Sequence, residues 1–384
     1  MGPEPSESNP RPALPRSVTI LLTLGAATLV AFGVGAARGI FTPVFFAFVL
    51  TLCVHPVRRW MQARGIPRGI ATGTTIVAVF GLLAGFGAVL LASLAQFSAL
   101  LPQYADEIDQ VSARLTGMLE AIGVGPQHVQ AMRDGFIEFL GGFLGSFADL
   151  VGSLVIILTM LILMAIDGSR VPALLTHLRH HRPALVSAFI DFGTGVRRYM
   201  VATTVLGTAQ GLFNWLVLVL LHVPGAPLWG LLSFICSFIP NIGYFIAIIP
   251  PLFFGFLTGG WPTVVIIIVV YGGINGVIQS IIQPKYVGNA VSLSETLTFV
   301  SVLFWALLLG PTGAILAVPL TLFIRTILLD SEPSNVWWRP LTGDTTDIQP
   351  LLRQEDDAIR ARRARPRPAA PPDTEPDTGR APRP

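Results

Sequence analysis

The sequence predicts an all-α polytopic membrane protein with about six to eight membrane segments. Of its 384 residues, 52% are hydrophobic and only 12% are charged, and the mean hydropathy is +0.66. Soluble globular domains are usually about 25% charged. Apolar runs of about 20 residues, the length that crosses a bilayer, recur along the chain. This composition excludes a soluble enzyme, a nucleic-acid-binding domain and a disulfide scaffold.

The cysteines, the lysine and the absence of a hydrolase motif exclude several kinds of functional site. Cys53 and Cys236 both lie inside apolar runs and form no CxxC metal motif. Lys285 is the only lysine, and it follows Pro284 rather than the glycine of a Walker A phosphate-binding loop. There is no GxSxG turn of a hydrolase. We therefore expect no enzymatic activity, cofactor, metal site, ATP-driven pump or nucleic-acid partner.

Eight apolar segments set the expected organisation of the chain. The first is long for the core of a signal peptide and a second run follows it directly, which favours a retained span. We expect an N-terminal tail at 1–16, spans in 17–97, an insert at 98–145, a second membrane region at 146–330 and a tail at 331–384. The segments cover 17–36, 39–55, 70–97, 146–166, 201–221, 228–257, 262–282 and 295–328.

Arginine placement predicts the orientation, because loops rich in Lys and Arg stay in the cytoplasm. The loop at 56–69 carries arginines and no acid, and the loop at 167–200 is also rich in arginine. The segment at 98–145 is acidic and should face the outside. Both chain termini are then cytoplasmic.

The insert at 98–145 has its own helical pattern. Its apolar residues recur at spacings of three and four on both sides of a Gly-Pro turn, which predicts an amphipathic helical hairpin outside the cytoplasm. The apolar stripe is buried either on the hairpin itself and the membrane surface, or against another subunit. By contrast, the tail at 331–384 is rich in proline and arginine and should be largely disordered.

Two apolar segments, 228–257 and 295–328, are interrupted in matching positions. Proline removes a backbone donor and glycine permits a turn, so breaks are expected at Pro240–Gly243 and Pro311–Gly313. A broken backbone is tolerated in a bilayer only where protein or a water-filled cavity covers it. Such a pair of interrupted segments is typical of the binding site of a secondary transporter.

Two interpretations of these segments remain open. As one helix, 295–328 would be about 51 Å long, against a bilayer core of about 30 Å. Either both segments are proline-kinked, tilted spans, or they are opposed re-entrant hairpins. The interpretations place 283–294 on opposite sides of the membrane, and Lys285 favours the cytoplasmic side.

The helix between the breaks carries an amide stripe. Asn275, Gln279 and Gln283 recur every four residues and so share one face. They either hydrogen-bond to neighbouring helices or line a permeation path. With the breaks they make up the predicted substrate path: Pro240, Asn241, Gly243, Tyr244, Asn275, Gln279, Gln283, Pro284, Lys285, Gly288, Pro311, Gly313 and Pro319.

Titratable groups are scarce near these segments. Glu295 is the carboxylate beside both breaks, so it is the candidate for ion or proton coupling. The alternative is an acid that stabilises a helix start, since Ser292 and Ser294 precede it. His177, His180 and His181 fit a basic interfacial loop better than a metal site.

Three motifs of the last third are distinctive when taken together. They are IPNIG at 239–243, Asn275 with QPKYVG at 283–288, and GPTGAILAVP at 310–319. On these motifs the sequence resembles the autoinducer-2 exporter (AI-2E) family of bacterial membrane proteins. The resemblance covers roughly 17–330 and includes the order of the spans and the insert after the third. One departure is Tyr244, where the family often has proline or a small residue.

The resemblance implies transport of small molecules out of the cell across the bacterial inner membrane. The expected function is a secondary transporter or facilitator that exports a small polar solute similar to autoinducer-2. A sodium(lithium)/proton antiporter and an oligomeric scaffold or pore are the alternatives. The implied partners are the bilayer, the solute, a monovalent cation or proton, and further copies of the chain, plausibly in a pentamer.

Overall fold

The computed structural model describes residues 15–104, 151–168, 170–283, 293–332 and 342–343, with isolated positions between 110 and 149. Within these residues every regular element is helical, and five helices are long and apolar enough to cross a membrane. This confirms the all-α membrane fold. Most of the predicted amphipathic insert and nearly all of the tail lie outside the described residues. The five helices are α1 (Arg16–Ala36), α2 (Arg38–Ala63), α3 (Arg68–Leu100), α8 (Pro183–Leu220) and α10 (Gly243–Gly276).

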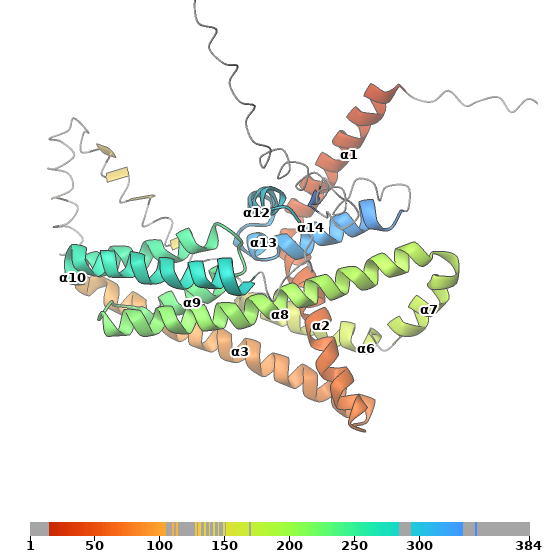
Figure 1. Cartoon of the computed structure of the whole chain (residues 1–384), viewed down its shortest axis with the longest axis horizontal. Coiled ribbons are helices and arrows are strands. Elements are labelled where there is room, and N and C mark those ends of the chain that lie inside the picture. The colour runs from red at the N-terminus through yellow and green to blue at the C-terminus, as the bar shows by residue number, and fades with distance from the viewer. Residues whose placement is uncertain are drawn as a thin grey trace, which may run out of the picture.

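Helix α8 organises the described part of the fold. It runs along the long axis of the molecule and packs against α2, α9 and α10 (Figure 1). The shared hydrophobic core joins these helices to the last hairpin of the chain. Helix α1 instead projects from the body and meets α12 where Gly35 lies against Leu308.

The basic segment at 167–200 is helical, whereas its charge pattern had indicated a loop. Helix α6 (Leu154–Asp167) bends by 63° into α7 (Val171–His181), and α8 begins at Pro183. If α6 and α7 form one broken span, the number of candidate spans rises to six.

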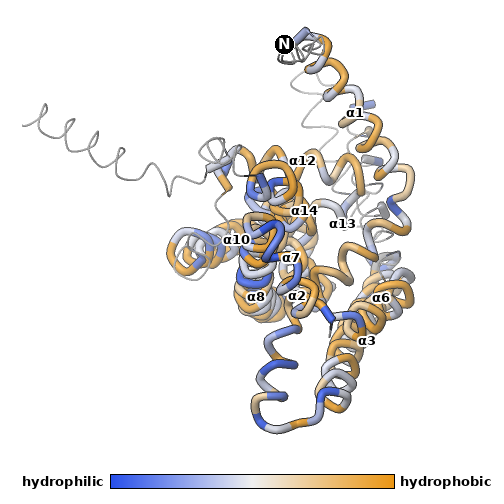
Figure 2. Tube along the Cα trace, turned by 90° about the vertical axis from the view of Figure 1, so that its right-hand side faces the viewer, coloured by the Kyte–Doolittle hydropathy of each residue, from blue (hydrophilic) through white to orange (hydrophobic). Residues whose placement is uncertain are grey.

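Hydrophilic residues also gather where α2 ends and turns towards α3, through the short link before Arg68 (Figure 2).

The first broken segment folds back on itself. Helix α9 (Ala226–Cys236) ends before a turn in which Asn241 has a φ of 64°, and α10 begins at Gly243. The Trp229 and Phe254 rings then stack across the two arms, 5.7 Å apart. At 1.5 Å per residue, α9 is only about 16 Å long, well short of the bilayer core.

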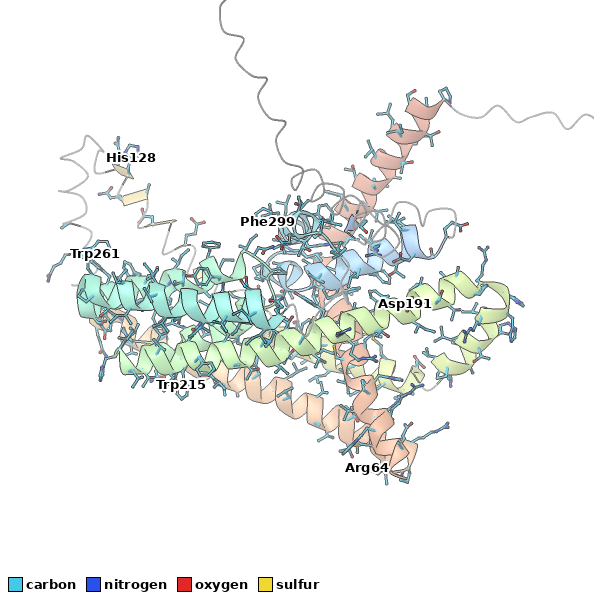
Figure 3. All side chains as sticks on the ribbon, viewed as in Figure 1. Arg64, His128, Asp191, Trp215, Trp261 and Phe299 are labelled. Atoms are coloured by element: carbon cyan, nitrogen blue, oxygen red, sulfur yellow. The ribbon has the colours of Figure 1, made fainter. Side chains whose placement is uncertain are left out.

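Helix α10 itself contains a second reversal. Its backbone leaves the helical region at Gly260, where φ is 64° and ψ is −158°. A Cβ at Gly255 would lie 2.6 Å from Ile267 Cδ1, so the two arms run side by side. Trp261 marks the reversal at the end of the molecule (Figure 3). The second arm continues as a π-helix, η2 (Val277–Ile282).

The second broken segment is also a helical hairpin. Helix α12 (Glu295–Leu309) is followed by Gly310, by the short α13 (Pro311–Ile315) and α14 (Ala317–Arg325), and by the π-helix η4 (Thr326–Asp330). The indole Nε1 of Trp305 donates to Thr321 Oγ1 across the arms at 3.1 Å. Both breaks therefore reverse the chain, as the hairpin interpretation expected; re-entry into a bilayer stays a prediction.

The tight reversals make a prediction about two glycines. A Cβ at Gly243 would collide with the carbonyl oxygen of Cys236, and one at Gly313 with that of Trp305. Because backbone atoms yield little, we expect Gly243→Ala and Gly313→Ala each to lower the free energy of unfolding by about 1–3 kcal/mol. Thermal unfolding of the purified protein in detergent measures this.

Gly85→Ala in α3 is the matched control, because a Cβ there has no heavy atom within 4 Å. It should leave the melting temperature unchanged or slightly raised. Equal melting temperatures for all three variants would contradict the tight packing of the two turns.

Candidate functional site

One face of α8 is polar and buried. Thr203, Gln210 and Asn214 are only 5%, 6% and 1% exposed. Gly207 and Gly211 lie on the same face and let α9 approach closely: a Cβ at Gly211 would be 2.7 Å from the carbonyl oxygen of Gly230. Small residues at such a crossing bring polar side chains of two helices within hydrogen-bond reach.

Hydrogen bonds join this face to α9 and to the residues that follow it. The Asn214 Nδ2 donates to Ser233 Oγ at 3.1 Å, and Ser233 Oγ donates to the carbonyl of Trp229 at 2.9 Å. The Ser237 hydroxyl donates to the carbonyl of Ser233 at 2.8 Å and lies 3.4 Å from Gln210 Oε1. Each serine thus bonds to its own helix and also to a side-chain amide of α8.

An open pocket lies beside this polar face. Its free cavity is about 20 Å³, room for about one water-sized group, within about 390 Å³ of non-atom space that includes open solvent. The turn of the first hairpin and the amide stripe meet there, although they are far apart in the sequence. Tyr244 and the three stripe amides face the hydroxyls of α8 and α9. The lining residues are Thr203, Leu206, Gly207, Gln210, Ser233, Cys236, Ser237, Gly243, Tyr244, Ala247, Asn275, Ile278, Gln279 and Gln283.

The described lining of the pocket is polar but uncharged. It contains hydroxyls and carboxamides and no Asp, Glu, Lys, Arg or His. Asn275 Oδ1 is buried and has no hydrogen-bond partner among the described residues. A buried acceptor of this kind costs about 1–3 kcal/mol unless something satisfies it. The pocket is therefore suited to a solute that carries hydrogen-bond donors.

The pocket unites only part of the predicted substrate path. Gly243, Tyr244, Asn275, Gln279 and Gln283 line it. Pro240 and Asn241 lie at the adjacent turn without lining it, while Pro311, Gly313 and Pro319 belong to the second hairpin. Pro284, Lys285 and Gly288 lie outside the described residues. The roles of all these residues stay predictions.

Glu295 is exposed in the first turn of α12 and lines neither described pocket. The Ser294 Oγ accepts from the backbone N–H of Leu297 at 3.2 Å, which is the geometry of an N-cap. A carboxylate in this turn also suits the helix dipole. The local structure thus accounts for Glu295 without coupling, and the coupling role stays a prediction.

The contribution of α8 was not predicted from the sequence. Residues 203, 207, 210 and 214 are spaced by three and four, which could have revealed a polar face within an apolar span. The partly buried ion pair between Arg325 and Asp330, whose Nε–Oδ2 distance is 3.4 Å, was also not predicted. Asp330 ends η4, directly after the second hairpin.

The long apolar helices define a multi-pass membrane protein, and paired helical hairpins beside a polar pocket are features that secondary transporters share. The chain belongs to the AI-2E family: the model of the "AI-2E family transporter" matches residues 18–332. This confirms the resemblance that the motifs indicated. A transport role, rather than an enzymatic one, is supported by the family.

Three curated relatives illustrate the match. The chain is 26% identical to the AI-2 transport protein TqsA of Escherichia coli K12 over 80% of its length and 91% of that protein. It is 26% identical to the putative transport protein YhhT of the same strain, over 79% of its length and 88% of YhhT. It is 28% identical to a putative transport protein of Haemophilus influenzae, over 86% of its length and 97% of that protein.

The bond between α8 and α9 can be tested by mutation. We expect Ser233→Ala to lower the free energy of unfolding by about 1–2 kcal/mol, because Asn214 Nδ2 loses its acceptor in a buried site. Chemical or thermal unfolding in detergent measures the loss. Thr208→Val is the control on the exposed face of α8, where the hydroxyl bonds only to the carbonyl of Thr204 at 2.7 Å. Equal losses in the two variants would show that the bond between the helices adds nothing.

Proposed function

We propose that this chain moves a small, neutral, polar solute across the bacterial inner membrane through the pocket beside α8. The observation that carries the proposal is a pocket whose described lining offers hydroxyls and carboxamides but no charged side chain. A carboxamide supplies both an acceptor and donors, so it can replace the water around a hydroxyl or carbonyl group. A charged solute would instead stay unpaired in a site of low dielectric constant.

The hairpins explain how such a pocket can exist within a membrane. Their short arms and reversed chain suit segments that enter and leave the bilayer on one side, with both chain termini in the cytoplasm. Turn residues inside a membrane need a covering protein or a cavity. The first turn meets that requirement, because Gly243 and Tyr244 border the pocket. We infer that movement of the second arm of α10 and η2 against α8 and α9 opens the pocket to each side.

Autoinducer-2 is the first solute to test, because the relative TqsA is named an AI-2 transport protein.

A sodium(lithium)/proton antiporter is the second candidate function. Its coupling needs a titratable group on the path. Glu295 and the Asp330–Arg325 pair are the described groups beside the second hairpin, and neither lines the pocket. Assembly into a homo-oligomer, such as a pentamer, remains part of the proposal.

Transport is tested with purified protein in proteoliposomes loaded with autoinducer-2. We expect efflux above that of protein-free vesicles, at the same rate with and without an imposed proton gradient, because the pocket's described lining holds no proton-binding carboxylate. Efflux accelerated by the gradient would instead indicate coupling, and Glu295→Gln should then abolish the acceleration. No efflux in either condition would remove autoinducer-2 as the solute.

The amide stripe is tested in the same assay. We expect Asn275→Leu and Gln279→Leu each to lower the flux by about tenfold or more, because a site built from hydrogen-bonding groups discriminates strongly when one is lost. Ile281→Leu, at an exposed position of η2, is the control and should retain the flux. If the stripe variants transport as fast as the control, the amides serve only in helix packing.

A further inference from the structure

A second pocket lies between α2, α3 and α6 and shares no lining residue with the first. Its free cavity is about 50 Å³, within about 420 Å³ of non-atom space that includes open solvent. Arg58 and His55 line it from α2, one helical turn apart. Nothing in the proposed transport path requires a cation here, so the guanidinium needs its own explanation.

Arg58 has unused hydrogen-bonding capacity. Its Nη1 donates to the carbonyl oxygen of Ala165 at 3.1 Å, in the last turn of α6. Its Nε is buried and has no hydrogen-bond partner among the described residues. A guanidinium carries five N–H donors in a planar fork, which matches two oxygens of a phosphate. The bond to the Ala165 carbonyl therefore uses only one of the five donors of the Arg58 guanidinium.

The rest of the pocket is apolar. Val54, Ile76 and Leu161 contribute hydrocarbon walls. Thr51 and Thr75 add little polarity, since their hydroxyls donate to the carbonyls of Ala47 and Ala71 in their own helices, at 2.8 and 2.6 Å. The surface of the pocket is thus almost wholly apolar, and the Arg58 guanidinium lies at its edge. An amphiphile with an acyl chain and an anionic head group matches this arrangement.

The neighbouring elements place this pocket at a membrane surface. Val171, Leu174 and Leu178 are exposed along one face of α7, and Arg179, His180 and His181 occupy its last turn. A short amphipathic helix of this kind, set at 63° to α6, is typical of one that lies in the bilayer interface. The pocket's Gly168 lies at the α6–α7 bend.

Basic residues outnumber acidic ones around the pocket. The charged groups that act on His55 are Arg59, Arg58 and Arg197, all of them cations. Asp167 is the acidic residue next to the pocket's Gly168. The adjacent end of α2, which carries Arg64, is also hydrophilic and basic (Figures 2 and 3). Basic pockets between membrane helices on the cytoplasmic side are suited to anionic lipid head groups.

We propose that the pocket between α2, α3 and α6 binds the phosphate of an anionic phospholipid. The Arg58 guanidinium pairs with the phosphate oxygens while it keeps its bond to Ala165, and an acyl chain follows the wall formed by Val54, Ile76 and Leu161. The bound lipid would tie α2 to the carboxyl end of α6 at the membrane surface.

Native mass spectrometry of the full-length protein, titrated with phosphatidylglycerol or with phosphatidylcholine of the same acyl chains, tests this site. We expect phosphatidylglycerol to bind more tightly than phosphatidylcholine, and Arg58→Gln to weaken it by about tenfold, because charge-assisted bidentate bonds are lost. Arg38→Gln, which removes the same charge from an exposed position at the far end of α2, should retain the binding.

A second pair of variants keeps the test valid if Arg58→Gln fails to fold. Ile76→Trp fills the apolar wall and should abolish the preference for phosphatidylglycerol, whereas Val77→Trp on the exposed face of α3 should keep it. Equal binding of the two lipids, or equal losses in Arg58→Gln and Arg38→Gln, would overturn the proposal. Displacement of the lipid by millimolar inorganic phosphate would also overturn it, in favour of a site for a free anion.

Discussion

The close contact between α8 and α9 is the constraint on which the described pocket depends. Gly211 and Gly230 face each other so closely that a Cβ on Gly230 would lie 3.0 Å from the carbonyl oxygen of Gly211. Backbones at this distance allow short side chains such as Ser233 and Asn214 to bond across the interface. The same contact holds the first arm of the hairpin in place, so the position of its turn follows from the crossing. A larger side chain at either glycine would push α8 and α9 apart and separate Gln210 and Asn214 from Ser233 and Ser237.

The turn of the first hairpin shows how a broken backbone can persist in an apolar setting. The Tyr199 hydroxyl donates to the carbonyl of Phe238 at 3.2 Å, and the N–H of Gly243 donates to the carbonyl of Ile239 at 3.0 Å. These bonds satisfy groups that the break would otherwise leave without partners, which would cost several kcal/mol each in hydrocarbon. The stability of the turn thus depends on a side chain of α8 as well as on local geometry.

The sequence predicted the elements of this fold better than their assembly. Long apolar runs, the two Pro/Gly breaks and the four-residue amide repeat are local signals, and each corresponds to a helix, a reversal or a face in the structure. The sequence predicted that the amide stripe lies near the first turn, but not that the two line one pocket. The polar face of α8 was overlooked because its average composition is apolar. The pocket around Arg58 depends on which three helices meet, and no periodicity within one segment encodes that contact.

The π-helix η2 has a geometric consequence for the amides of the second arm. In an α-helix, residues four apart drift around the axis by about 40° per step, because each residue turns by about 100°. A helix with i→i+5 hydrogen bonds has more than four residues per turn, so a step of four residues there drifts in the opposite sense. Gln279 lies inside η2 and Gln283 directly follows it. The two drifts offset each other and keep Asn275, Gln279 and Gln283 close to one line along the helix. In the proposed transport path, successive amides would then be met along one side of this helix.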